Sequence, residues 1–98
     1  GFQNLLGLKN IKMEIDKISS FEVNSKKQFI EFINLLRQDL VENPKSWENK
    51  NLNDFLDAIG SYAEDIQGYY ENFDINMNSD EPSWQVFADI FKGAKVYE

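Results

Sequence analysis

The sequence predicts an all-α fold, a small antiparallel bundle of about four helices. Apolar residues recur at three- and four-residue spacing along most of the chain, and capping residues precede the apolar stripes. No pair of alternating segments predicts two strands that could form a hairpin. The 98 residues are 42% hydrophobic and 14% aromatic, enough for one modest core. We therefore expect a single helical domain over residues 1–98.

The first predicted helix, residues 3–19, has the weakest pattern. Residues 11–15 also alternate as a strand does, but no second strand signal is available to pair with them, so a helix is favoured. We expect residues 1–23 to form a loosely attached N-terminal helix. Its helical spacing comes from Leu5, Leu8, Ile11, Ile15 and Ile18.

The second predicted helix spans residues 26–42. Ser25 stands three residues before Gln28, which is the spacing of a capping box. Asn43 precedes Pro44, and a residue before proline is pushed out of the helical region. The apolar stripe consists of Phe29, Phe32, Ile33, Leu36 and Leu40. Three further residues widen it and predict cover on more than one side: Ile30, Leu35 and Val41.

The third predicted helix spans residues 52–73, with Asn51 as its N-cap and Asp54 in its first turn. Gly60 and Gly68 lie inside it, and each costs about 1 kcal/mol relative to alanine. Such glycines indicate either the close approach of a neighbour or a local bend. The stripe consists of Leu52, Phe55, Leu56, Ile59, Tyr62, Ala63, Ile66, Tyr69, Tyr70 and Phe73.

The last predicted helix spans residues 82–96 and follows a polar, turn-like segment at 74–81. Pro82 fits the first helical position, where its missing N–H is not needed. Two apolar faces are expected. One consists of Trp84, Phe87, Ala88, Phe91 and Ala94, and the other of Val86, Ile90 and Tyr97.

Charge is distributed unevenly along the chain. The formal net charge is −7. The first fifty residues carry eight basic and seven acidic residues, whereas residues 51–98 carry two basic and ten acidic ones. No lysine or arginine lies between Asn51 and Phe91. This pattern fits either a solvated, solubilising surface or a negative face that steers a basic partner. It argues against binding to nucleic acid or to an anionic membrane.

The composition excludes several kinds of chemistry. The chain has no cysteine and no histidine, which removes disulfides, zinc fingers, thiol nucleophiles and histidine bases. The most suggestive acid is Asp65, one helical turn from Tyr62 and Tyr69. It fits a structural hydrogen-bond acceptor better than a catalytic group. We expect no enzymatic activity and no cofactor.

Residues 74–80 offer a partial match to a calcium-binding loop. Oxygen-bearing side chains stand at the first, third, fifth and seventh positions: Asp74, Asn76, Asn78 and Asp80. The match then fails. Ser79 replaces the glycine of the sharp turn, and Gln85 replaces the bidentate glutamate at position twelve. We expect a polar loop between helices and no metal.

The remaining candidates are large aromatic residues and the acids near them. Aromatic rings with polar handles are enriched in interface hot spots. The alternative is that these rings close a small core. The candidate partner-binding residues are Trp47, Glu48, Glu64, Asp65, Tyr69, Tyr70, Glu71 and Trp84.

Residues 24–98 carry a recognisable series of short motifs. They read Phe29-x-x-Phe32-x-x-x-Leu36, Asn43-Pro44-x-x-Trp47-Glu48-Asn49, Asp65-x-x-Gly68-Tyr69-Tyr70-x-Asn72, Pro82-Ser83-Trp84-x-x-Phe87-Ala88 and Ala94-x-x-Tyr97-Glu98. This series resembles a family of short, acidic, uncharacterised bacterial proteins, a domain of unknown function. The resemblance implies bacterial origin and an all-helical domain, and it adds no chemistry. In size and charge such domains are similar to the immunity proteins of toxin systems.

Together these features predict a protein–protein interaction module whose acidic half, residues 51–91, contacts a basic partner. The alternative is a homo-oligomeric structural domain in which exposed aromatic residues are buried between copies. We expect no nucleic-acid partner, because the chain is acidic. We expect no membrane partner either, since no apolar run is long enough to span a bilayer. The opening residues lack the basic region of a signal peptide, so a cytoplasmic location is expected.

Overall fold

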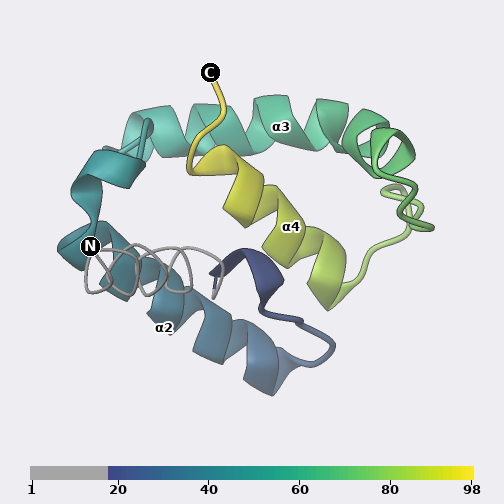
Figure 1. The fold of residues 1–98 in the computed structure, drawn as a ribbon, viewed down its shortest axis with the longest axis horizontal. Coiled ribbons are helices and arrows are strands. Elements are labelled where there is room, and N and C mark those ends of the chain that lie inside the picture. Colours follow the sequence, from purple (N-terminus) through teal and green to yellow (C-terminus); the bar gives the residue numbers. More distant parts are fainter. Residues whose placement is uncertain (1–17) are drawn as a thin grey trace, which may run out of the picture.

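The computed structural model describes residues 18–98 and shows a small all-α bundle. Its elements in chain order are α2 (Lys26–Glu42), the 3₁₀ helix η1 (Pro44–Ser46), α3 (Leu52–Asn72) and α4 (Trp84–Ala94), and this part of the chain contains no strand. Helix α4 lies between α2 and α3 (Figure 1). The predicted fold class is confirmed. The predicted helix at 3–19 lies outside the described residues, except for residues 18–19, which are helical together with residue 20.

Helix α2 has the predicted bounds because its caps are encoded locally. The Ser25 hydroxyl accepts a hydrogen bond from the Gln28 N–H at 3.1 Å. The Gln28 side chain reaches back to the Asn24 N–H at 2.7 Å, one residue earlier than in a standard capping box. At the other end, Asn43 leaves the helix and Pro44 begins η1.

Helix α3 begins as predicted. The Asn51 side chain accepts from the Asp54 N–H at 2.8 Å and donates to the Asp54 carboxylate at 2.8 Å. The helix ends one residue before the predicted Phe73. Asp74 adopts the left-handed conformation, with φ of 55°, and the Ile75 N–H bonds the Tyr70 carbonyl at 2.8 Å. These features form a Schellman motif, in which Asp74 takes the position usually held by glycine.

Helix α4 is shorter than the predicted 82–96. It starts at Trp84, because Ser83 is the N-cap and its hydroxyl accepts from the Val86 N–H at 3.1 Å. Pro82 therefore precedes the helix and does not occupy its first position, which corrects the prediction. A serine whose hydroxyl can satisfy a free N–H is the stronger start signal.

The core consists of two apolar clusters, one on each side of α4. Both predicted faces of α4 meet a cluster, because Ala88 and Phe91 pack in the first and Val86 and Ile90 in the second. Phe87 is nevertheless 40% exposed, and Tyr97 lies beyond the end of the helix. The buried residues of the first cluster are Ile18, Val23, Phe32, Leu36, Trp47 and Ala88. Those of the second, between α4 and α3, are Ile66, Tyr70 and Val86.

Within residues 18–98, no element covers the second side of α2 that its wide stripe predicts to be covered. Val41 is 80% exposed and Ile30 is 54% exposed. Leu52 and Leu56, in the predicted stripe of α3, are also exposed. In the described chain, α2 packs against α4 and η1, so one face of α2 has no helix against it.

The two glycines inside α3 do not mark a close contact. A Cβ placed on Gly60 or Gly68 would meet no atom within 4 Å apart from its own helix. The close approach occurs instead at Gly93 in α4, where an added Cβ would overlap the ring of Tyr62. The glycine that packing requires is therefore one that the helical pattern did not single out.

Alanine at these glycines will have opposite effects. Gly60→Ala and Gly68→Ala each raise the free energy of unfolding by about 0.5–1 kcal/mol, because alanine favours the helix and the space is open. Gly93→Ala lowers it by about 1–3 kcal/mol, because the Tyr62 ring must move. Urea unfolding followed by circular dichroism measures all three. A stabilising Gly93→Ala would show that α4 and α3 do not approach closely there.

Candidate functional site

A buried ion pair joins the end of α4 to α2. The Lys95 ammonium lies 2.7 Å from the Asp39 carboxylate, and both side chains are almost fully buried. The Trp47 indole N–H donates to the same carboxylate at 2.8 Å, and the Asn43 amide donates to its other oxygen at 3.2 Å. Both carboxylate oxygens thus have partners, as a buried charge requires.

The electrostatics of this site favour the ionised carboxylate. Burial by itself raises the pKa of Asp39, but the hydrogen bonds from Lys95 and Trp47 and the positive charge of Lys95 outweigh it and hold the pKa below its usual value of 3.8. The Lys95 ammonium also lies 5.7 Å from the centre of the Trp47 ring, within range of a cation–π interaction. Asp39, Lys95 and Trp47 therefore form a structural site.

The backbone after η1 is attached to the same end of α4. The Lys95 carbonyl accepts hydrogen bonds from the N–H groups of Glu48 and Asn49 at 3.1 and 3.3 Å. The Asn49 amide donates to the carbonyls of Ala94 and Tyr97 at 2.8 and 2.7 Å. These bonds satisfy the Ala94 carbonyl, which the helix end leaves free, and the carbonyls of Lys95 and Tyr97 just after it.

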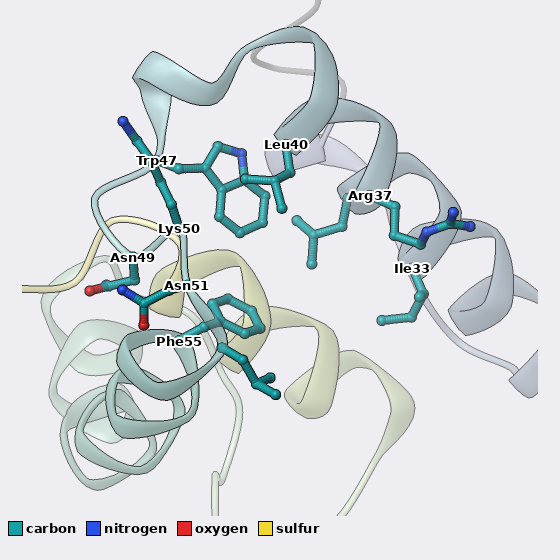
Figure 2. Close-up of a pocket in the computed structure, with 10 residues that line it drawn as sticks. Ile33, Arg37, Leu40, Trp47, Asn49, Lys50, Asn51 and Phe55 are labelled. Carbon is teal, nitrogen blue, oxygen red and sulfur yellow. The ribbon is translucent and has the colours of Figure 1, made fainter.

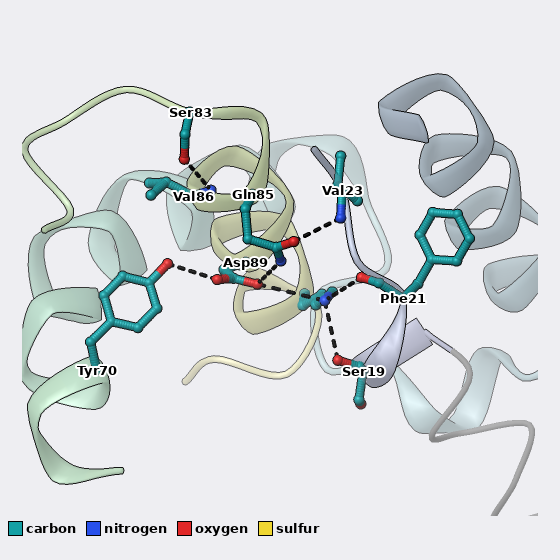
Figure 3. A network of polar contacts seen from close by, with 9 residues as sticks. Ser19, Phe21, Val23, Tyr70, Ser83, Gln85, Val86 and Asp89 are labelled. Carbon is teal, nitrogen blue, oxygen red and sulfur yellow. Dashed lines mark hydrogen bonds and ion pairs between the residues drawn. The ribbon is translucent and has the colours of Figure 1, made fainter. Parts of the chain in front are cut away.

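A second polar network surrounds Asp89 on α4 (Figure 3). Its carboxylate accepts from the Tyr70 hydroxyl at 2.7 Å and from the Gln85 amide at 2.8 Å. Lys92 lies 3.5 Å from it and donates to the Phe21 carbonyl at 2.9 Å. This network connects α3, α4 and the segment before α2. Burial, followed by the bond to Asp89, raises the pKa of Tyr70 above its usual value.

Both lysines of the second half of the chain are therefore used inside the fold. Lys95 neutralises Asp39, and Lys92 pairs with Asp89. No exposed basic side chain remains within residues 51–98. The exposed acids of this half are Asp54, Asp57, Glu64, Asp65, Glu71, Asp74, Asp80, Glu81 and Glu98.

Five of these acids form a row along α3, which we call the acid row. They fall within about one third of the helix circumference, on the side opposite Phe55 and Ile66. All of them are exposed. The members of the acid row are Asp54, Asp57, Glu64, Asp65 and Glu71.

The four candidate aromatic anchors separate into two pairs. Trp47 is 5% exposed and Tyr70 is fully buried, so neither can anchor a partner. These two rings belong to the core, which is the alternative considered above. Tyr69 and Trp84 are 42% and 38% exposed. Because Trp84 contacts Phe29, with ring centres 5.4 Å apart, only part of its ring is on the surface.

The four candidate acids, Glu48, Glu64, Asp65 and Glu71, are all exposed. Asp65 is exposed on α3, and its carboxylate accepts a hydrogen bond from the Tyr97 hydroxyl, so it is a hydrogen-bond acceptor as the sequence predicts. That bond raises the pKa of Tyr97. Glu48 lies apart from the acid row, in the segment attached to α4.

The segment between α3 and α4 is held by Gln67. The Gln67 amide donates to the Met77 carbonyl at 3.2 Å and its oxygen accepts from the Ser79 N–H at 2.8 Å. The Asn78 side chain accepts from the Asp80 N–H at 2.9 Å. No group of three or more acidic side chains positioned to hold a metal is found among residues 18–98.

The position of Asp39 in the sequence indicates a buried acid on α2. Asp39 follows Phe32 by seven residues and Leu36 by three, so it lies on the buried stripe of α2. An acid on an apolar stripe indicates a buried partner. The identity of that partner, 56 residues away, is not contained in local spacing.

Removing one member of the ion pair will strongly destabilise the fold. Lys95→Met leaves the Asp39 carboxylate buried without its counter-charge, which costs about 3–5 kcal/mol. The double variant Asp39→Asn/Lys95→Met keeps an oxygen acceptor for Trp47 and removes both charges, so it is more stable than Lys95→Met. Urea unfolding at pH 7 measures both. A double variant less stable than the single one would contradict the pairing.

The same pair predicts a loss of stability in acid. Because the pKa of Asp39 is lowered in the folded state, its stabilising contribution is complete above the usual value of 3.8 and is lost as the pH falls through the lowered value. Unfolding free energies between pH 5 and pH 2 should therefore fall less steeply for Asp39→Asn than for the wild type. Equal slopes would show that Asp39 does not ionise differently in the two states.

Comparison with known proteins yields a family but no activity. No helix within residues 18–98 is long and apolar enough to cross a membrane. No curated protein and no solved structure matches the chain significantly. The model of a family of unknown function, DUF7660, matches residues 25–98, which confirms the resemblance to a domain of unknown function. The chain therefore belongs to this family of unknown function.

Proposed function

We propose that this domain is a protein–protein interaction module whose acidic half, residues 51–91, binds a basic partner. The observation that supports this proposal best is the internal use of Lys92 and Lys95. Lys92 and Lys95 are the only two basic residues of residues 51–98, and they pair with Asp89 and Asp39. The exposed acids of this half are therefore not neutralised by a basic residue of the same half.

The acid row is the centre of the proposed contact. It lies on a helix of 21 residues, which is about 30 Å long at 1.5 Å per residue. Like charges on one face attract a complementary partner over several ångströms and raise the rate of encounter. Tyr69 supplies an exposed ring beside this face for short-range contact. An immunity-like role is the version of this proposal in which the partner is a basic toxin.

We propose binding rather than catalysis because the perturbed titratable groups have structural partners. Asp39 pairs with Lys95, Tyr70 donates to Asp89 and Tyr97 donates to Asp65. Burial raises the pKa of Tyr62 to about 12, and its ring packs on Tyr97 with centres 5.2 Å apart. These interactions account for the shifts through packing and pairing.

Neutralising three of the five acids in the acid row will strongly reduce partner capture. The variant Asp57→Asn/Glu64→Gln/Glu71→Gln removes three charges without changing shape. Glu22→Gln/Glu31→Gln/Glu42→Gln removes three exposed acids of the first half and is the matched control. Bacterial lysate is passed over each immobilised protein at low and high salt, and captured proteins are identified by mass spectrometry.

We expect the wild type and the control to retain a basic protein at low salt and to release it at high salt, since exposed charges are screened. The acid-row variant should retain little of it. Capture that is indifferent to salt, or reduced equally by both triple variants, would contradict the electrostatic proposal.

Self-association is a second candidate, favoured by one observation. Phe73 is 66% exposed at the end of α3 and packs at a tilt against Tyr69, with ring centres 4.8 Å apart. Such a pair would be buried in a symmetric dimer. Light scattering over a concentration series tests it, because a protein that stays monomeric does not bury this pair between copies.

A further inference from the structure

An apolar groove opens between α2 and the start of α3, on a surface distinct from the acid row. It has a volume of about 260 Å³, and six apolar residues line it together with Arg37, Asn49, Lys50 and Asn51. Figure 2 shows Ile33 and Leu40 of α2 facing Phe55 of α3, with Trp47 at one end. Phe55 packs on Trp47 with ring centres 5.7 Å apart, so the core itself forms part of the groove wall.

The apolar surface continues outward along both walls. Ile30 stands three residues before the groove residue Ile33, and Val41 four residues after Arg37, so both lie on the groove side of α2. On α3, Leu52 lines the groove and is 72% exposed. A small ligand would leave these side chains in water, whereas a protein segment laid along the groove would cover them.

The charges at the groove are opposite in sign to those of the protein as a whole. Its lining contains two cations, Arg37 and Lys50, and no carboxylate. Both cations are exposed, so their ammonium and guanidinium groups are available to a partner. Lys26, four residues before Ile30, adds a third exposed cation to the same side of α2. An occupant with acidic groups beside its apolar residues would be complementary to this rim.

We propose that this groove binds an amphipathic helix from a partner protein, with apolar residues on one face and aspartate or glutamate flanking them. The apolar side chains enter between α2 and α3, and the acids reach Arg37 and Lys50. The inference goes beyond the proposed function, because the acid row lies on the side of α3 opposite Phe55 and would bind a basic surface.

The test is a displayed library of sixteen-residue helices. Apolar positions recur at the a and d positions, and every flanking position is drawn equally from glutamate and lysine. Clones are selected on the wild type and counter-selected on Leu52→Ser/Leu56→Ser, which alters two exposed side chains and leaves the core intact. The selected clones are then measured against Trp84→Phe, in which Trp47 is the sole tryptophan and reports on the groove.

We expect the selected clones to be enriched in glutamate and to change the fluorescence of Trp47. Arg37→Glu/Lys50→Glu should weaken them by on the order of tenfold. Lys27→Glu/Lys45→Glu makes the same change in net charge outside the groove lining and is the matched control, which should leave affinity nearly unchanged. The acid-row variant should also bind these clones as the wild type does, so failure here is separable from failure of the proposed function.

Three results would overturn the proposal. The first is that no selected clone loses binding to Leu52→Ser/Leu56→Ser. The second is that the clones that do lose binding carry more lysine than glutamate at their flanking positions. The third is a dimer of the free protein, seen by light scattering, that Leu52→Ser/Leu56→Ser dissociates. In that case the groove is an interface between copies of this chain.

Discussion

The buried pairing of Asp39 with Lys95 is the constraint on which the described structure depends. The pair connects the buried stripe of α2 to Lys95, the C-cap of α4. Trp47, from the segment between α2 and α3, donates a hydrogen bond to the Asp39 carboxylate. A charge in this position is tolerated only when it is paired and hydrogen-bonded. The ends of α2 and α4 and the chain between them must therefore meet in one arrangement. Asn49 strengthens it by donating to the carbonyls of Ala94, the last residue of α4, and of Tyr97.

This internal pairing also determines the surface. The second half of the chain has two lysines, and the fold places both against carboxylates inside the molecule. The acids that remain exposed on α3 are consequently uncompensated within their own half. The two basic side chains at the groove, Arg37 and Lys50, come from the first half. A small domain thus presents a negative helix face and a positive-rimmed apolar groove on different sides of α3. The proposed binding function rests on this separation of charge between two surfaces.

Much of the fold was predictable because helix ends are local. Ser25, Asn51 and the Asn43–Pro44 pair act within four residues of the helix ends they define, and α2 and the start of α3 fall where these signals predict. The predicted start of α4 was wrong because two adjacent residues each indicate a helix start. Pro82 favours a helix that begins at residue 82, and Ser83 as an N-cap favours one that begins at residue 84. All four candidate acids lie on the surface, since charged residues off an apolar stripe stay in water. The candidate aromatics could not be assigned in this way, because a large ring is equally suited to a core and to an interface.

By itself the sequence determined the helical class, the main helix ends and the unequal division of charge between the two halves. These follow from periodicity, capping and counting, which require no knowledge of distant residues. Only the tertiary structure decided that Trp47 and Tyr70 are core and that Gly93 lies against Tyr62. It also decided that both lysines of the acidic half turn inward and that a groove remains beside α2. Each of these outcomes depends on contacts between residues far apart in the chain, where local spacing carries no information about the partner.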